Sequence, residues 1–283
     1  MEIRTFATCF LFMKKFLYIL LITLVFSSCS EFQKALKSED TAVKFKLGTE
    51  LFDAGKYSKA NRLFAQIVPS YRGKPQAEKL MYMYAMSYYN MKDYHLSGYQ
   101  LERFESSYPK SEKAEEAMFL SAKSYYMLSP VYSKEQKETK EAIEKLQLFI
   151  NKFPNSQYLA EANTLVKELD FKLEKKAYEI AKQYNTTAYY ESSDYEAAIK
   201  AFDNFLLDYP GSSFREQAMF YRLESAYKLA VNSVEYKKLE RLNIALGHFN
   251  AFKKYFSDSE FYAEAERMNQ EMQTELQKLN TKS

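Results

Sequence analysis

Five short segments of the chain share one pattern, in which an aromatic residue is followed by a helix breaker and then by a small polar residue. Proline cannot continue a helix, and it moves the residue before it toward extended geometry. A serine or asparagine after the break can accept from the free N–H groups that open the next helix. Each segment therefore predicts the end of one helix and the start of another. The segments are residues 107–111, 151–156 and 208–212, a looser version at 71–75, and a version without proline at 255–259.

The spacing of these junctions indicates what they separate. The intervals between their aromatic residues are 37, 45, 56 and 47 residues. A helix-turn-helix repeat of the tetratricopeptide (TPR) type has a period of about 34 residues. The first interval is close to this period, and the later ones are read as the same unit with insertions. At the junction before residue 215 we expect Ser213 and Glu216 to form a capping box.

The first repeat shows the packing pattern of a TPR unit. Gly48 follows a leucine, Leu51 lies three residues on, and Ala60 and Phe64 mark the second helix. The small residues allow close helix approach and the large ones fill the space that is left. Because only 6 glycines and 6 prolines occur in 283 residues, we predict an all-α fold. It comprises five TPR-like helix-turn-helix repeats that form a superhelical solenoid.

Within this fold we expect two groups of repeats. Residues 41–170 would hold repeats 1–3, and residues 171–283 would hold repeats 4–5 with a polar capping helix from 261 to 279. One long helix from 157 to 184, or two nearly collinear helices, would join the groups, since no helix breaker interrupts the segment. A polar insertion at 129–137 interrupts the third repeat. It is either a docking feature or, as the simpler interpretation, a solvated loop.

The N-terminus has the features of a bacterial lipoprotein signal. Lys14 and Lys15 precede an apolar run from Phe16 to Phe26, which is too short for a typical transmembrane helix. Cys29 follows two serines, and the only other cysteine in the sequence is Cys9. We expect residues 1–28 to be a signal peptide, with Met13 a plausible alternative start. Cys29 would carry a covalent lipid, and residues 29–40 would form a tether.

The sequence gives little support for a catalytic function or for nucleic-acid binding. The formal net charge is only +3, which gives no electrostatic case for nucleic acid. His95 and His248 lie in different repeats, without metal-ligand spacing, and no glycine-rich phosphate loop occurs. We therefore expect a protein that is not an enzyme, holds no metal and needs no cofactor besides the lipid.

Aromatic residues suggest a binding surface instead. Six tyrosines crowd the second repeat between residues 82 and 99, and not all of them can face one core at helical spacing. In a TPR superhelix the first helix of each repeat faces the concave side. Such a groove suits an extended peptide with an aromatic end, although ordinary contacts between helices would explain the same residues. The pattern places these residues along the groove: Phe45, Thr49, Phe52, Met83, Ser87, Asn90, Phe119 and Tyr126.

Several segments resemble the BamD family, the lipoproteins of the β-barrel assembly machinery. These are residues 153–158 with the long helix to Tyr184, residues 173–182, and Asp208-Tyr209-Pro210. The resemblance covers about Phe45 to Lys228, and the last repeat departs from it. It implies a periplasmic scaffold without catalysis, anchored to the cell outer membrane. Repeats 1–3 would bind C-terminal signals of unfolded outer-membrane β-barrel proteins, and repeats 4–5 would dock on a BamA-type barrel protein.

Two other interpretations stay open. A TPR lipoprotein that assists secretin or pilus assembly would share the signal and the repeats. A glycan-binding TPR lipoprotein would also share them, but the chain has no tryptophan for a sugar platform.

Overall fold

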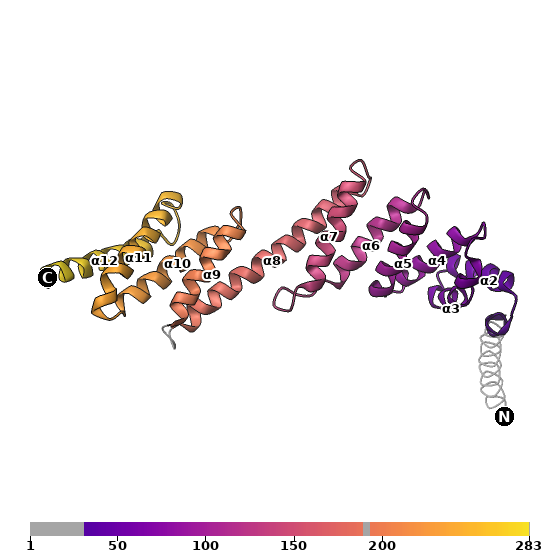
Figure 1. The fold of residues 1–283 in the computed structure, drawn as a ribbon, viewed down its shortest axis with the longest axis horizontal. Coiled ribbons are helices and arrows are strands. Elements are labelled where there is room, and N and C mark those ends of the chain that lie inside the picture. The colour runs from indigo at the N-terminus through magenta and orange to yellow at the C-terminus, as the bar shows by residue number, and fades with distance from the viewer. Residues whose placement is uncertain (1–30, 189–192, 283) are drawn as a thin grey trace, which may run out of the picture. The chain divides into compact units, whose positions relative to one another are not determined.

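The structure is a computed structural model that describes residues 31–188 and 193–282, and these residues contain helices and no strand (Figure 1). Cys29, the predicted signal peptide and residues 189–192 lie outside the described residues. The helices are α2 (Thr41–Asp53), α3 (Tyr57–Ile67), the 3-10 helix η1 (Val68–Tyr71), α4 (Ala77–Asn90), α5 (Tyr94–Ser107), α6 (Ala114–Leu128), α7 (Lys137–Lys152), α8 (Leu159–Thr187), α9 (Ser193–Asp208), α10 (Arg215–Val231), α11 (Glu235–Tyr255) and α12 (Tyr262–Lys282).

Neighbouring helices pair in chain order. α2 packs on α3, α4 on α5, α6 on α7 and α10 on α11, and the second half of α8 shares a buried cluster with α9. These five pairs confirm the predicted all-α fold of TPR-like repeats. The turns inside the first two pairs each hold one residue in the left-handed region, Gly55 at φ 71° and Lys92 at φ 62°. Glycine adopts this conformation without strain, whereas lysine pays roughly 1 kcal/mol for it.

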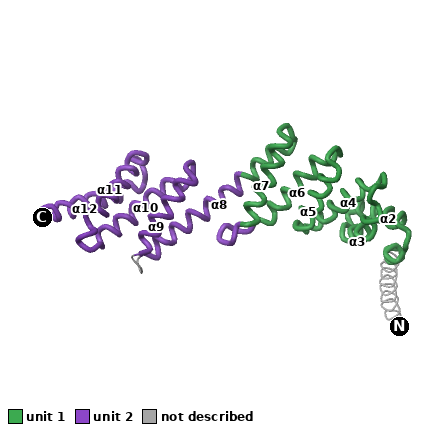
Figure 2. Tube along the Cα trace, in the orientation of Figure 1, with its two compact units in different colours: residues 1–129, 137–166 green, residues 130–136, 167–283 purple. Residues whose placement is uncertain are grey.

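The helices form two compact units (Figure 2). Within the described chain, unit 1 comprises the residues up to Ser129 together with Lys137–Val166, and unit 2 comprises Pro130–Gln136 and the residues from Lys167 onward. Helix α8 therefore begins in unit 1 and ends in unit 2. The short segment 130–136 belongs with unit 2, although its neighbours in sequence belong to unit 1.

At four of the five junctions the aromatic residue before the break packs on an aromatic residue one helical turn earlier. The ring centroids are 5.4 Å apart for Phe104 and Tyr108, and the other three pairs have nearly the same spacing. The earlier residue of every pair is at most 1% exposed. The break is thus anchored in the core of its own repeat. The other pairs are Phe149–Phe153 at 5.6 Å, Phe205–Tyr209 at 5.5 Å and Phe252–Phe256 at 5.7 Å.

The serines of four junctions cap the helix that follows, and three of them also bond to the repeat before. The Oγ atoms of Ser111, Ser156, Ser212 and Ser259 each accept from the backbone N–H two residues on, at 2.9–3.0 Å. Three of these hydroxyls also donate to a glutamate on the first helix of the preceding repeat. These helices are α4, α6 and α8. Ser111 donates to Glu78 and Ser156 to Glu115, both at 2.6 Å, and Ser212 donates to Glu174. Ser111, Ser156 and Ser212 therefore each tie the start of one repeat to the repeat before it.

The predicted capping box at α10 is wrong. Ser213 is exposed, and Phe214, the residue before α10, has no side-chain cap. The backbone N–H of Ser212 donates to the carbonyl oxygen of Tyr209, and this turn places Ser212 rather than Ser213 beside the free N–H groups. The cap therefore comes from Ser212, the serine closer to the proline.

Part of the predicted tether is a docked helix. Residues 31–37 are helical, and Phe32 and Ala35 are buried against Leu63. The cationic groups of Lys59 and Arg62 lie 5.6 Å and 5.4 Å from the centre of the Phe32 ring. The segment is thus held to the first repeat by apolar burial and cation–π contacts. In the part of the chain described here, no helix combines the length and the apolar character needed to cross a membrane.

Helix α12 closes the last repeat, in the region where a capping helix is predicted. Ala265, Met268 and Met272 on α12 are buried in the cluster that α10 and α11 form. On its polar side the Lys238 ammonium group lies 2.9 Å from the Glu275 carboxylate. Hydrogen bonds from Lys278 and Lys238 lower the pKa of Glu275 to about 2.

Two neighbouring serines give a matched test of the junction. Replacing Ser212 by alanine removes the acceptor for the Phe214 N–H and the donor to Glu174, so we expect the free energy of unfolding of unit 2 to fall by about 1–2 kcal/mol. Replacing the exposed Ser213 by alanine should change it by less than about 0.5 kcal/mol. Urea denaturation followed by circular dichroism measures both variants. Equal effects of the two substitutions would show that the junction serine has no special role.

Candidate peptide-binding surface

The residues predicted to line a groove divide into two groups in the structure. Phe45, Thr49 and Phe52 are half-buried on α2, Asn90 is exposed at the end of α4, and Tyr126 is half-buried on α6. The Phe45 ring stacks on Tyr71, with centroids 5.4 Å apart. This first group leaves side-chain surface accessible.

The second group is buried, and the prediction that these residues line the groove is wrong. Met83 is 5% exposed, Ser87 is fully buried and Phe119 is 1% exposed. The Ser87 Oγ accepts from the Asn61 amide at 2.8 Å and donates to the Tyr84 carbonyl oxygen, so its hydrogen-bonding capacity is used internally. The Phe119 ring lies between Phe149 and Tyr158, with centroids at 5.4 Å and 4.6 Å. None of these three side chains can reach a ligand.

The error on α4 is a shift of one residue. Leu80, Met83 and Ser87 are buried, and their spacing of three and four marks the helix face that packs against the preceding repeat. Residues one position earlier along the helix, Tyr82 and Met86, lie on a different face and are half-buried. Leu80 and Met83 show the spacing of a core face in the sequence, whereas the burial of Ser87 depends on its distant partner Asn61.

Tyr82 is the centre of the first polar and aromatic group on this face. Its ring lies 5.3 Å from Phe104 and 5.5 Å from the Lys113 ammonium group. Burial raises the pKa of Tyr82, and the nearby Glu116 carboxylate, which accepts from its hydroxyl, raises it further. Lys113 pairs with Glu116 at 2.8 Å. The phenol is therefore protonated at neutral pH.

Tyr89 is the centre of the second group. Its ring contacts Tyr94 at 6.0 Å in an edge-on arrangement. Burial raises the pKa of Tyr89, and the charge of Lys123 opposes this effect, so the lysine lies near the phenol. Lys123 pairs with Glu161 at 2.6 Å and is about 29% exposed. An aromatic face and an accessible ammonium group thus lie close together.

We call Tyr82, Tyr89, Glu116 and Lys123 the α4–α6 surface. The tyrosine rings offer large contact area with a hydroxyl at the edge. Lys123 uses one N–H donor on Glu161 and has two others to offer a carboxylate. This combination suits recognition of a peptide end that carries both an aromatic ring and a carboxylate. In the described residues no group of three or more histidine, cysteine, aspartate or glutamate side chains could hold a metal ion.

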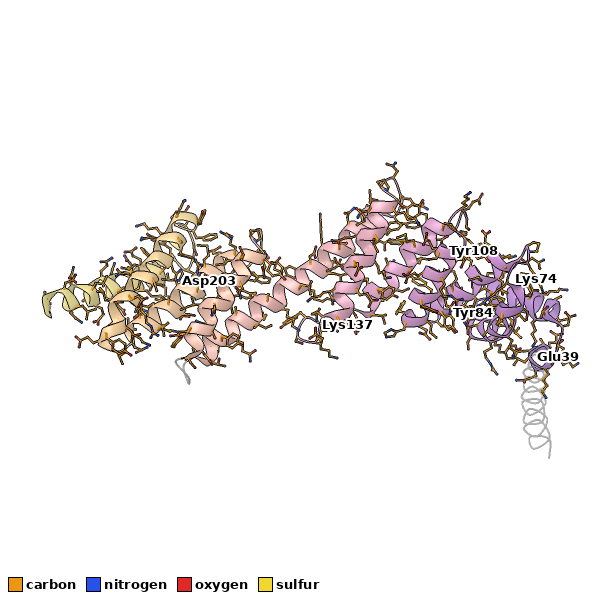
Figure 3. The ribbon with its side chains drawn as sticks, in the orientation of Figure 1. Glu39, Lys74, Tyr84, Tyr108, Lys137 and Asp203 are labelled. Carbon is orange, nitrogen blue, oxygen red and sulfur yellow. The ribbon has the colours of Figure 1, made fainter. Side chains whose placement is uncertain are left out.

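The two histidines lie in different environments, neither of which resembles a catalytic pair. His95 is exposed on α5. His248 on α11 is half-buried, and burial together with the positive charge of Arg222 lowers the pKa of His248 to about 4, although Asp203 opposes the shift. The Arg222 guanidinium lies 2.7 Å from the carboxylate of Asp203, which is labelled on α9 in Figure 3. His248 is therefore a neutral packing residue at pH 7.

A family model described as "outer membrane lipoprotein", YfiO, matches residues 38–188 and 185–281. The chain belongs to the YfiO family of outer membrane lipoproteins. This confirms the resemblance to the BamD family that the junction motifs suggested. No curated protein matches this YfiO-family chain significantly in sequence.

Two of the solved structures to which the chain is similar are described as TPR or TPR-like. The TPR2AB domain of yeast Sti1 in complex with pHSP90 is 13% identical, with a TM-score of 0.38, over 81% of this chain and 96% of that chain. A putative kinesin light chain of Podosopora anserina with nearly identical TPR-like repeats is 12% identical, with a TM-score of 0.31, over 78% of this chain and 100% of that chain.

Because the pKa of His248 is lowered in the folded protein, the free energy of unfolding of unit 2 should depend on pH. Above pH 6.5 the imidazole is neutral in both the folded and the unfolded chain. Below pH 6.5 the unfolded chain binds a proton, whereas the folded chain binds it only near pH 4. The free energy of unfolding therefore falls as the pH drops from 6.5 to 4. Urea denaturation of unit 2 across this range should show a shallower fall for His248→Gln than for the unmodified protein.

The matched control is His95→Gln, which replaces the exposed histidine of unit 1. It should leave the pH dependence of unit 2 unchanged. An unaltered pH dependence in His248→Gln would mean that other groups dominate in this range.

Proposed function

We propose that this outer membrane TPR lipoprotein is a non-catalytic scaffold for β-barrel assembly. Unit 1 binds unfolded outer-membrane β-barrel proteins, and unit 2 docks on a BamA-type barrel protein. A lipid on Cys29 anchors the chain to the periplasmic face of the outer membrane. Membership in the YfiO family supports this function, and the α4–α6 surface is the observation that carries it.

The α4–α6 surface matches the chemistry of the proposed clients. A β-barrel protein that ends in phenylalanine presents a ring and a carboxylate at the end of an extended chain. The ring would pack on Tyr89 and the carboxylate would approach Lys123. Because an unfolded client loses conformational entropy when it binds, the affinity is expected to be modest. Modest affinity suits a protein that passes its client to another subunit.

Unit 2 presents apolar residues that its own fold does not use. At the start of α11, Val234, Tyr236 and Leu239 are 56%, 81% and 50% exposed. Exposed apolar residues that gather in one place are typical of protein interaction sites. We call these three residues the α11 patch, and we assign it to the barrel partner.

A pair of tyrosine variants tests client binding. The probe is a short synthetic peptide with alternating apolar residues and a C-terminal phenylalanine, and the readout is fluorescence anisotropy. Tyr89→Ala should weaken binding roughly tenfold, because a buried aromatic contact is worth about 1–2 kcal/mol. Tyr99→Ala on α5, where the side chain is 52% exposed, should leave binding unchanged. If both variants bind the peptide as the unmodified protein does, the α4–α6 surface is not the client site.

Affinity purification tests the docking partner. The native protein is isolated from detergent-solubilised outer membranes, and co-purifying proteins are identified by mass spectrometry. We expect a BamA-type barrel protein in near-stoichiometric amount. Tyr236→Ala should reduce its recovery, whereas Tyr255→Ala, at the other end of α11 and 58% exposed, should not. Recovery of a secretin, a pilus component or a sugar transporter instead would favour one of the other TPR lipoprotein functions.

A further inference from the structure

The loop between α6 and α7, residues 130–136, is held in one conformation by a single buried side chain. Gln136 is 2% exposed. Its amide nitrogen donates to the carbonyl oxygens of Val131, Tyr132 and Lys134 at 2.9, 3.3 and 2.9 Å. The backbone N–H of Lys134 also donates to the Val131 carbonyl at 3.1 Å. This segment is therefore a built feature rather than a loop shaped only by solvent. Lys137, labelled in Figure 3, opens α7 directly after it.

Two lysines of α8 fasten this loop to the helix within unit 2. The Lys176 ammonium group donates to the Lys134 carbonyl oxygen at 2.5 Å. The Lys175 ammonium group lies 4.6 Å from the centre of the Tyr132 ring. The loop thus forms a fixed wall beside α8.

A groove of about 490 Å³ lies between this wall and α8. Tyr132 and Ser133 line it from the loop, and Lys176, Ile180, Gln183 and Thr187 line it from the helix. Their spacing of four, three and four places the helix residues in one stripe. The stripe is roughly 16 Å long, the length of about five residues of extended chain.

Ile180 is the apolar residue that lines the groove from α8, and further exposed apolar residues lie next to the groove. Ile180 is 44% exposed, and Tyr184, one turn further along α8, is 41% exposed. Val131, on the loop, is 60% exposed. An apolar side chain of a ligand would remove this surface from water at roughly 25 cal/mol per Å².

The charge around the groove is positive and unpaired. Lys175, Lys176 and Lys182 lie along this part of α8, and Glu179 is the carboxylate among the lining residues. Within the described chain none of these three lysines forms an ion pair, and Glu179 forms none either. Lys176 uses one of its three donors on the loop, which leaves two for a ligand. Such a site attracts carboxylates.

We propose that this groove binds an extended acidic segment of a partner protein. The segment places an aliphatic or aromatic side chain on Ile180 and carboxylates beside Lys176 and Lys182. The five-residue length and the open form fit a peptide, and the unpaired lysines select its charge. The site is separate from the α4–α6 surface and from the α11 patch, and it does not depend on the function assigned to either.

The experiment selects octapeptides from a random displayed library on the purified protein. We expect the recovered peptides to combine aspartate or glutamate with an apolar residue. The strongest peptide is then measured by fluorescence anisotropy beside its counterpart with asparagine and glutamine in place of the acids. The counterpart should bind at least roughly tenfold more weakly, and the affinity of the acidic peptide should fall as ionic strength rises.

Charge variants locate the binding. Lys182→Glu should weaken the acidic peptide roughly tenfold or more, whereas Lys167→Glu, on an exposed position of α8 outside the groove, should not change its binding. Ile180→Glu and Ile180→Lys both remove this apolar side chain, and the glutamate variant should lose clearly more affinity than the lysine variant. Circular dichroism of each variant checks that the helices are intact.

Three results would overturn the proposal. The recovered peptides could lack acidic residues, or their binding could be equal in Lys182→Glu and Lys167→Glu. In the third case no peptide binds, while vesicles that contain anionic lipid bind and lose affinity in Lys182→Glu. That outcome would assign the groove to a membrane surface.

Discussion

The hydrogen bond between a junction serine and a glutamate of the preceding repeat is the contact on which the repeat architecture depends. Ser111, Ser156 and Ser212 each make it, and each also caps the helix that follows. One hydroxyl therefore fixes both where a helix begins and where it sits against its neighbour. The aromatic pair before the break, with centroids 5.4–5.7 Å apart, anchors the other side of the same turn. A solenoid has only neighbour contacts, so a junction that orients successive repeats determines the fold.

The same arrangement places a stacked ring two residues after two of these junction serines. Tyr158 and Phe214 lie two residues after the junction serines, and they stack on Phe119 and Tyr178 at 4.6 and 4.7 Å. At the junction that opens the third repeat the corresponding position is Lys113, which lies over the Tyr82 ring of the second repeat instead of stacking on it. A lysine covers less of the ring and brings a charge, and the glutamate that it attracts lies beside the phenol. The α4–α6 surface is thus a departure from the repeat pattern at one junction.

The sequence predicted the repeats well because their signals are local. Proline, a preceding aromatic and a following serine act within a few residues, so five helix pairs and their order followed from the junctions. It was harder to predict which face of α4 is buried. Tyr82, Met83, Met86 and Ser87 are all compatible with a surface or a core, and the buried pair of Ser87 with Asn61 spans 26 residues. Judged by hydrophobicity alone, Ser87 would be expected at the surface. Only its hydrogen bond with the distant Asn61 shows that it is buried. The choice of Ser213 over Ser212 failed for a local reason, since the backbone turn decides which hydroxyl reaches the helix.

The insertion at 130–136 was beyond sequence reasoning for a different reason. Its composition is that of a solvated loop, and nothing local distinguishes Gln136 from any exposed glutamine. Its structure comes from one amide that meets three carbonyl oxygens and from a lysine of α8 some 40 residues away. Ordering the backbone of each residue costs about 1–2 kcal/mol. These hydrogen bonds offset that cost and hold the segment in place. The regular repeats form the scaffold. A loop that interrupts them and is held rigid by them, such as 130–136, can give the protein specificity for one partner. The unpaired lysines of α8 lie beside such an interruption, which is why the groove there, rather than a regular helix face, carries the charge recognition.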